Sequence, residues 1–318
     1  MTARNAQILR WILRIAITVL FAFMVNRGIT REQLSILGEH LRWGWIVTAF
    51  ILGMLSLLFQ LLRWREILNI EGFGNSLVQA FRTFAWGHLL AFITPGRIGE
   101  FGRALALDSR RKADSVASVV IDKTFTVLAT AVCGAAGMAG QFWVLGSQPP
   151  QRMTLCMWLF CIAVPLAFLA LRVWVERPAK TGRIGLLARR LHGTLVVIPR
   201  FFSGRIVIYS LAAQSALLVQ TAMILSMFGN GSFFSNMVIA AQVYAFMLFL
   251  PFFIANIGLR EYSFSMMFDS IKPVFHHSLA MGSIVLGVSF LILIMNILLP
   301  AAVGLCIMII DKKHRSTI

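Results

Sequence analysis

Three charged residues, Arg97, Glu100 and Arg103, lie within seven positions of one another in the stretch "FITPGRIGEFGRALAL", residues 92–107. On a helix, residues three positions apart share a face, so the carboxylate would lie between two guanidinium groups. Such a stripe could bind a phosphate group, because a guanidinium donates to two phosphate oxygens at once, while the carboxylate could hold a cationic head group. An internal salt bridge that only locks the local fold is the other interpretation, and the sequence leaves both open.

The surroundings of this stretch are apolar. The chain of 318 residues is 58% hydrophobic and 13% charged, with a mean hydropathy of +0.81, whereas a soluble domain is about 45–50% apolar and about 25% charged. We therefore expect an all-α polytopic membrane protein that forms a single integral membrane domain over residues 1–318, with halves 1–150 and 151–318. The net charge of +17 is then explained by basic loops beside the bilayer, and nucleic acid is not expected as a partner.

Seven apolar runs approach the roughly 20 residues that cross a bilayer. They lie at about 11–26, 43–62, 115–136, 153–174, 206–228, 233–254 and 278–310. Tryptophans near the ends of these runs fit an interfacial aromatic belt; they are Trp43, Trp45, Trp64, Trp143 and Trp174. Basic residues gather at 103–114 and 172–205, and such residues accumulate on the cytoplasmic side. This scheme predicts about six full crossings with both termini in the cytoplasm.

The same scheme requires residues 75–108 to enter and leave the membrane on one side, as a re-entrant hairpin. Pro95 and Gly96 would break a helix where the chain turns back. Residues 233–277 form a second hairpin, from the opposite side, by the same reasoning. Irregular backbone at membrane depth is tolerated only where it is buried in protein or lines a watery cavity. The sequence therefore predicts two re-entrant helical hairpins around a cavity.

A weaker copy of the first motif occurs in "LPFFIANIGLREYSFSMM". Ile98-Gly99 and Ile257-Gly258 are 159 positions apart (257 − 98), half of the chain, and Arg260 and Glu261 follow the second pair. Two short matches could arise by chance. Inverted repeats with interrupted helices that meet near the membrane midplane are nevertheless a recurrent transporter design. We therefore predict an inverted repeat in which Arg260 and Glu261 face the charged stripe of the first hairpin.

Further polar residues lie inside the predicted spans. Asp122 and Lys123 could pair with the first hairpin or with each other, and His88 is expected to be a satisfied buried histidine. Glutamines within spans more often hold helices together than bind a ligand; these are Gln60, Gln214, Gln220 and Gln242.

The segments "TPGRIGEFGRALAL", "ADSVASVVIDKTFTVLAT" and "PFFIANIGLREYSF" resemble the lysylphosphatidylglycerol synthase transmembrane family, also called the flippase-like family, over about residues 10–310. The resemblance implies a bacterial inner-membrane protein that moves an amphiphilic lipid between leaflets. A lipid head-group site is implied at Pro95, Gly96, Arg97, Gly99, Glu100, Arg103, Gly258, Arg260 and Glu261, to which Asp122 and Lys123 are added. Asp122-Lys123 stands where the family has Glu-Arg, and the second motif is less rich in Gly and Ser, so the substrate could differ.

Catalytic residues are not expected. The aminoacyl-transferring members of the family carry a soluble synthase domain, whereas this chain ends eight residues after its last apolar run. The sequence also lacks an Asp-x-Asp, a Gly-x-Ser-x-Gly and a His-Glu-x-x-His. We therefore expect no enzyme activity, no cofactor and no metal.

The predicted function is that of a lipid translocase, whose partners are membrane lipids with anionic or zwitterionic head groups, as phospholipids or lipid-linked precursors. One alternative is a nonenzymatic membrane partner of a lipid or polysaccharide synthesis complex. Another is an integral-membrane transferase, for which Glu100 or Asp122 would supply the acid or base. The sequence does not determine the lipid, the direction, the energy source or the oligomeric state.

Overall fold

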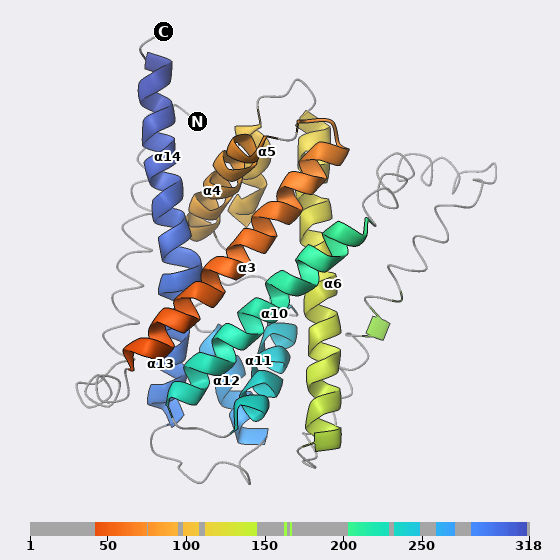
Figure 1. Ribbon diagram of the computed structural model, residues 1–318, viewed down its shortest axis with the longest axis vertical. Coiled ribbons are helices and arrows are strands. Elements are labelled where there is room, and N and C mark those ends of the chain that lie inside the picture. Colours follow the sequence, from red (N-terminus) through yellow and green to blue (C-terminus); the bar gives the residue numbers. More distant parts are fainter. Residues whose placement is uncertain are drawn as a thin grey trace, which may run out of the picture.

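Every regular element in the described part of the chain is a helix (Figure 1). The computed structural model describes residues 42–74, 76–94, 98–107, 112–144, 162–163, 166, 203–228, 232–248, 259–270 and 281–316. Four helical stretches in these ranges are long and apolar enough to cross a membrane: Trp43–Ile70, Asp114–Trp143, Gly204–Met227 and Ile284–Ile310. The protein is therefore an all-α, multi-pass membrane protein, as the sequence predicts. Of the other predicted crossings, 11–26 lies outside the described residues, as does 153–174 apart from residues 162–163 and 166.

Helix α3 (Trp43–Ile70) continues eight residues beyond the predicted end of its span at Leu62. It ends where Gly72 adopts a positive φ of 75°, and the amides of Gly72 and Phe73 donate to the carbonyls of Asn69 and Leu68. Helices commonly end at a glycine with positive φ, because glycine adopts this conformation without strain. The longer helix corrects one part of the predicted aromatic belt: Trp43 and Trp143 are exposed at helix ends, but Trp64 is fully buried.

The first predicted hairpin is present as a pair of packed helical arms. Helix α4 (Leu77–Ile93) begins at Ser76, whose hydroxyl accepts from the amide of Gln79. A 3₁₀ turn, η1 (Ile98–Phe101), and the short helix α5 (Gly102–Ala106) then pack back against α4. Helix α3 ends and helix α6 (Lys112–Val144) begins at the same end of the molecule (Figure 1). The two arms pack together as a hairpin requires, and a re-entrant hairpin over residues 75–108 stays a prediction.

The second hairpin enters from the other end. Helix α10 (Gly204–Met227) runs toward the lower end in Figure 1. There the chain turns into α11 (Phe233–Met247), which packs against α12 (Leu259–Ser270). Helix α13 (Met281–Leu293) also begins at that lower end. The two hairpins therefore point in opposite directions, as an inverted repeat requires.

The last crossing contains an interruption. After α13 the chain forms five residues of π-helix, η3 (Ile294–Leu298), and continues as α14 (Leu299–Ser316). Asn296 of η3 donates to Oε1 of Gln220 on α10 at 2.8 Å. Single turns of π-helix occur mostly as insertions within α-helices. This turn carries one amide of a part-buried pair where α10 and the last crossing meet.

Packing between the halves follows the same symmetry. The long helices α3 and α10 lie along each other, α4 packs on α14, and α11 packs on α6. Gly304 of α14 lies against Ala85, and Gly137 of α6 lies against Ala241. The two alanines hold matching positions, because Ala85 is the ninth residue of α4 and Ala241 is the ninth residue of α11. A Cβ on Gly137 would lie 2.6 Å from the Cβ of Ala241. Matching close contacts of this kind support the predicted inverted repeat.

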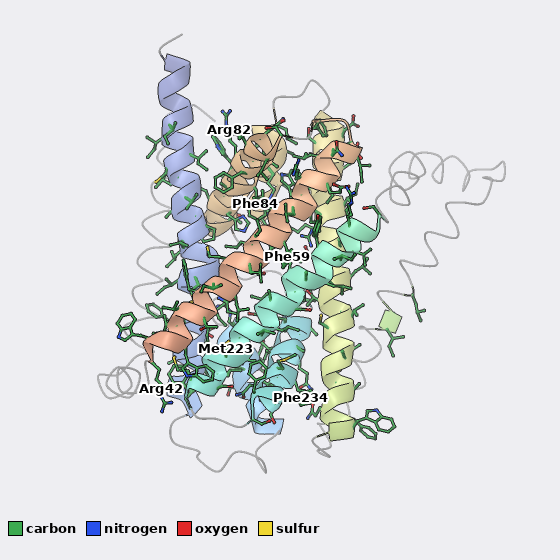
Figure 2. All side chains as sticks on the ribbon, viewed as in Figure 1. Arg42, Phe59, Arg82, Phe84, Met223 and Phe234 are labelled. Carbon is green, nitrogen blue, oxygen red and sulfur yellow. The ribbon has the colours of Figure 1, made fainter. Side chains whose placement is uncertain are left out.

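Each hairpin has its own buried apolar cluster. The first surrounds α4 and α5 and includes Trp64, Phe84 and Val119, and the second surrounds α12 and α13 and includes Phe264 and Val288. Side chains fill the space between the helices along the length of the molecule, with Phe84 in its upper half (Figure 2). The charged residues of each hairpin are therefore held in apolar surroundings.

Candidate functional site

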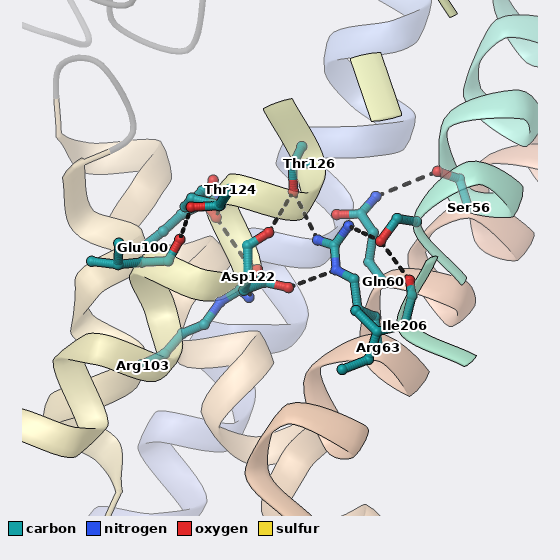
Figure 3. A network of polar contacts seen from close by, with 12 residues as sticks. Ser56, Gln60, Arg63, Glu100, Arg103, Asp122, Thr124, Thr126 and Ile206 are labelled. Carbon is teal, nitrogen blue, oxygen red and sulfur yellow. Dashed lines mark hydrogen bonds and ion pairs between the residues drawn. The ribbon is translucent and has the colours of Figure 1, made fainter. Parts of the chain in front are cut away.

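Asp122, near the middle of the first half of α6, is the centre of a buried ionic network (Figure 3). Arg63 of α3 donates from Nε to Oδ1 of Asp122 at 2.7 Å, and Arg103 of α5 donates from Nη1 to Oδ2 at 2.9 Å. Arg63 also donates from Nη2 to Oγ1 of Thr126 at 2.8 Å and from Nη1 to Oγ of Ser210 at 3.4 Å. One carboxylate thus joins α3, α5 and α6, and Arg63 extends the network to α10.

Glu100 connects this network to Lys123. Arg103 donates from Nη2 to Oε2 of Glu100 at 3.2 Å, and the ammonium of Lys123 pairs with the same oxygen. The Glu100 and Arg103 side chains are almost fully buried, whereas 34% of the Lys123 side chain is exposed. Lys123 therefore stands at the solvent- or lipid-facing edge of an otherwise buried group.

The position of Arg103 depends on glycines in the two arms. Its side chain crosses α4 at Gly87, where a Cβ would lie 2.5 Å from Nε of Arg103. The return arm approaches α4 so closely that a Cβ on Gly99 would overlap the carbonyl oxygen of Leu90, and one on Gly102 would overlap the Leu90 side chain. Close backbone approach of this kind requires residues without a Cβ. The glycines of "GRIGEFGR" therefore allow the return arm to lie directly on α4.

Aromatic rings cover the guanidinium of Arg103. Its Cζ lies 4.6 Å from the centroid of the Phe84 ring and 5.4 Å from that of Trp64. The Trp64 indole N–H donates to Oγ1 of Thr83 at 2.9 Å, which fixes the ring. Cation–π contacts in desolvated sites stabilise by about 2 kcal/mol. Arg103 is thus held by two carboxylates and two rings, the environment of a fixed structural cation.

Within the described residues the network contains three cations, Arg63, Arg103 and Lys123, and two carboxylates, Glu100 and Asp122. Its formal charge is therefore +1. Among the described residues no group of three His, Cys, Asp or Glu side chains is placed to hold a metal ion. The arrangement can do ionic chemistry: it can exchange a protein ion pair at its edge for a charged group of a ligand.

The sequence predicts most but not all of this group. Glu100, Arg103, Asp122 and Lys123 lie together, and of the two pairings that the sequence left open for Asp122 and Lys123, the structure has the one with the hairpin. Arg63 is not among the predicted site residues, because the predicted span ends at Leu62. The missing signal was Asp122 itself, since a carboxylate inside a span requires a buried cationic partner.

The second motif forms a separate polar group. Arg260, buried on α12, donates from Nη1 to the backbone carbonyl of Ser289 on α13 at 3.0 Å. Glu261 is half-buried on the same helix. Figure 1 draws α5 and α12 toward opposite ends of the molecule, and the polar partners of Arg103 and of Arg260 do not overlap. The two arginines therefore have no polar partner in common, and a cavity between the two motifs stays a prediction.

Other site residues lie outside the described part of the chain: Pro95, Gly96, Arg97 and Gly258. Gly99 lies in η1, and its amide donates to Oγ1 of Thr94 at 2.6 Å. The roles of Pro95, Gly96, Arg97, Gly99 and Gly258 as head-group ligands stay predictions.

The remaining polar residues within helices have structural partners. His88 is buried, and its Nδ1 lies 3.1 Å from the carbonyl oxygen of Phe84, as expected for a satisfied histidine. Three of the glutamines join helices: Gln214 accepts from Thr130, Gln220 accepts from Asn296, and Gln242 donates to Gln141. Gln60 donates to Ser56 within α3. The prediction that these glutamines hold helices together is thus confirmed for Gln214, Gln220 and Gln242.

These features define a class of protein: a multi-pass helical membrane protein with two opposed helical hairpins and buried charges on both return arms. Comparison with family models is more specific. Residues 11–299 match the family described as the lysylphosphatidylglycerol synthase TM region, and the chain belongs to that family. No curated protein and no solved structure matches the chain. The family relates the protein to lipid handling in membranes.

Proposed function

We propose that the protein is a lipid translocase, which moves an amphiphilic phospholipid or lipid-linked precursor between the two leaflets of the bacterial inner membrane. The observation that carries the proposal is the pair of opposed hairpins, each with an arginine buried on its return arm. An ionic lipid head group cannot cross hydrocarbon without partners, since charges in the bilayer core are costly. Opposed hairpins offer such partners from both sides, and membership of the family supports a role in lipid handling.

The edge of the first network suits a zwitterionic or anionic head group. Lys123 pairs with Glu100, and its side chain is partly exposed. A phosphate could replace Glu100 as the partner of Lys123, and a cationic head group could replace Lys123 as the partner of Glu100. The surplus positive charge of the network favours a ligand with net negative charge. In this proposal Lys123 is the mobile member, while Arg63, Arg103 and Asp122 hold the hairpin.

Several features accompany the proposal. Both termini lie in the cytoplasm, the protein acts without a cofactor or an enzyme activity of its own, and membrane lipids are its first partners. Enzymes of lipid or glycan synthesis are proposed as further partners, because they would supply or consume the translocated lipid.

Lipid transfer by the purified protein tests the function. The full chain is reconstituted into vesicles that carry a fluorescent phospholipid, and the fraction accessible to an impermeant quencher is followed with time. We expect faster exchange between leaflets than in protein-free vesicles. Glu100→Gln should slow exchange at least about 10-fold, because loss of a charge-assisted pair amounts to about 1.5–3 kcal/mol.

A matched control is Arg205→Gln, which removes an exposed cation whose only ion pair in the described residues is a 3.8 Å contact with Glu66. This variant should keep the parent rate. A nonenzymatic partner protein would give no exchange in any of these vesicles, and that result for the parent protein would refute the translocase. Equal rates for the parent and Glu100→Gln would remove Glu100 from the head-group path.

A further inference from the structure

The two buried arginines of the hairpins differ in their counter-ions. Arg103 pairs with Asp122 and Glu100, whereas the polar contact of Arg260 is with a neutral group, the Ser289 carbonyl. Only 4% of Arg260 is exposed, and its Nε, like that of Arg103, has no hydrogen-bond partner among the described residues. Within the described residues Arg260 has no ion pair with a carboxylate. No described carboxylate therefore neutralises the buried cation of the second hairpin.

Ser289 takes the place that Asp122 holds in the first half. Asp122 lies 15 residues before Gly137 (137 − 122), and Ser289 lies 15 residues before Gly304 (304 − 289). Both glycines are the ones that press against a hairpin arm of the opposite half. Each of the two residues also accepts a hydrogen bond from the arginine of its own hairpin. The second half thus has a serine where the first has the neutralising carboxylate.

Donors without partners remain around this position. The Ser289 hydroxyl is buried, with 3% of the residue exposed, and no residue in the described part of the chain is its hydrogen-bond partner. The surroundings are apolar, since Phe264, one turn after Arg260 on α12, and Val288 are fully buried. A desolvated cation and a desolvated hydroxyl both destabilise a protein unless a ligand satisfies them. An anion with oxygen acceptors would satisfy both.

We propose that Arg260 and Ser289 form the binding site for the phosphate group of the lipid, and that Arg103 of the first hairpin, with its two carboxylate partners, is a fixed structural cation. The lipid part of this assignment rests on the proposed function. Phosphate suits the site because a guanidinium donates to two of its oxygens and a hydroxyl to another. The translocated substrate is accordingly a phosphate-bearing lipid, and the arginines at matching positions of the two hairpins have different roles: Arg103 is structural and Arg260 binds the phosphate.

Binding can be measured without transport, by the unfolding temperature of the full chain in detergent. The probes are dihexanoylphosphatidylglycerol, dihexanoylglycerol as its phosphate-free counterpart, and sodium phosphate. We expect the phosphatidylglycerol to raise the unfolding temperature and the neutral lipid to leave it unchanged, since a ligand stabilises the state that binds it. Sodium phosphate as effective as the phospholipid at equal concentration would assign the site to free phosphate and overturn the lipid assignment.

Two arginine variants should have different effects on the unfolding temperature and on the binding of phosphatidylglycerol. Arg260→Gln removes a cation that has no carboxylate partner, so the ligand-free protein should unfold at the same or a higher temperature, and phosphatidylglycerol should bind about 10-fold or more weakly. Arg103→Gln, the matched control, removes two ion pairs and should lower the unfolding temperature while retaining the shift with phosphatidylglycerol. An Arg260→Gln variant as destabilised as Arg103→Gln, or one that binds as the parent does, overturns the proposal.

Ser289→Asp provides a second test that does not depend on losing Arg260. A carboxylate at this position should neutralise Arg260 as Asp122 neutralises Arg103, raise the unfolding temperature and abolish the shift with phosphatidylglycerol. Retention of the full shift would contradict the site. If the parent binds phosphatidylglycerol through Arg260 but does not move lipid in vesicles, the translocase fails and the binding site stands. If the parent moves lipid and neither variant alters binding, the site fails and the translocase stands.

Discussion

Arg103 of α5 and Asp122 of α6 form a buried ion pair, with 2.9 Å between Nη1 and Oδ2. The pair links the return arm of the first hairpin to the helix that follows it. Because Arg63 holds the other oxygen of Asp122, the same carboxylate also fixes α3. Three segments that meet at one end of the molecule (Figure 1) are thus joined by a single side chain.

The first prediction concerns that carboxylate. Asp122→Asn leaves Arg63 and Arg103 buried without their shared counter-ion, and loss of one partner from a buried ion pair costs about 3–5 kcal/mol. We therefore expect a large fall in the unfolding temperature of the purified protein. Asp114→Asn makes the same chemical change in the first turn of α6, on a half-buried residue, and should cost about 1 kcal/mol or less. Equal losses for the two variants would contradict the central role of Asp122.

The second prediction concerns the two symmetric glycine contacts. Gly304→Ala would force a Cβ against the backbone of Ala85, 3.0 Å from its carbonyl carbon, and Gly137→Ala would force one against Ala241. Overpacking of this kind costs about 1–3 kcal/mol, so both variants should unfold at lower temperature. Gly44→Ala, in a helix with no atom within 4 Å of the added Cβ, should be neutral or stabilising by up to about 1 kcal/mol. A neutral result at both contact positions would show that the arms do not pack as the structure has them.

The third prediction concerns topology. Single cysteines at Ser147 and Arg189, which lie outside the described residues, should react with an impermeant thiol reagent in different ways. Residue 147 should be labelled from outside intact cells, and residue 189 only after permeabilisation, because basic segments stay in the cytoplasm. The background must lack Cys133, Cys156, Cys161 and Cys306. Strong labelling of residue 189 in intact cells would rule out the proposed orientation.

The sequence by itself determined the class of fold and the position of the first hairpin. Long apolar runs can be satisfied only as helices in a bilayer, and Pro95, Gly96 and the charged residues that follow them mark a break in one of those runs. The matching Ile-Gly pairs also pointed to an inverted repeat. These properties are local, since they depend on hydropathy and on backbone preferences read along the chain.

Only the tertiary structure decided which charges neutralise one another. Arg63 lies 59 positions before Asp122 and reaches it because α3 and α6 meet beside the hairpin, and no spacing in the sequence encodes that contact. The structure also separated two motifs that look alike in sequence: Arg103 has carboxylate partners, whereas Arg260 is bonded to the Ser289 carbonyl. The physical reason is that a buried charge is stabilised or left unneutralised by groups that come from other helices. Which charges meet is therefore decided by how the helices pack.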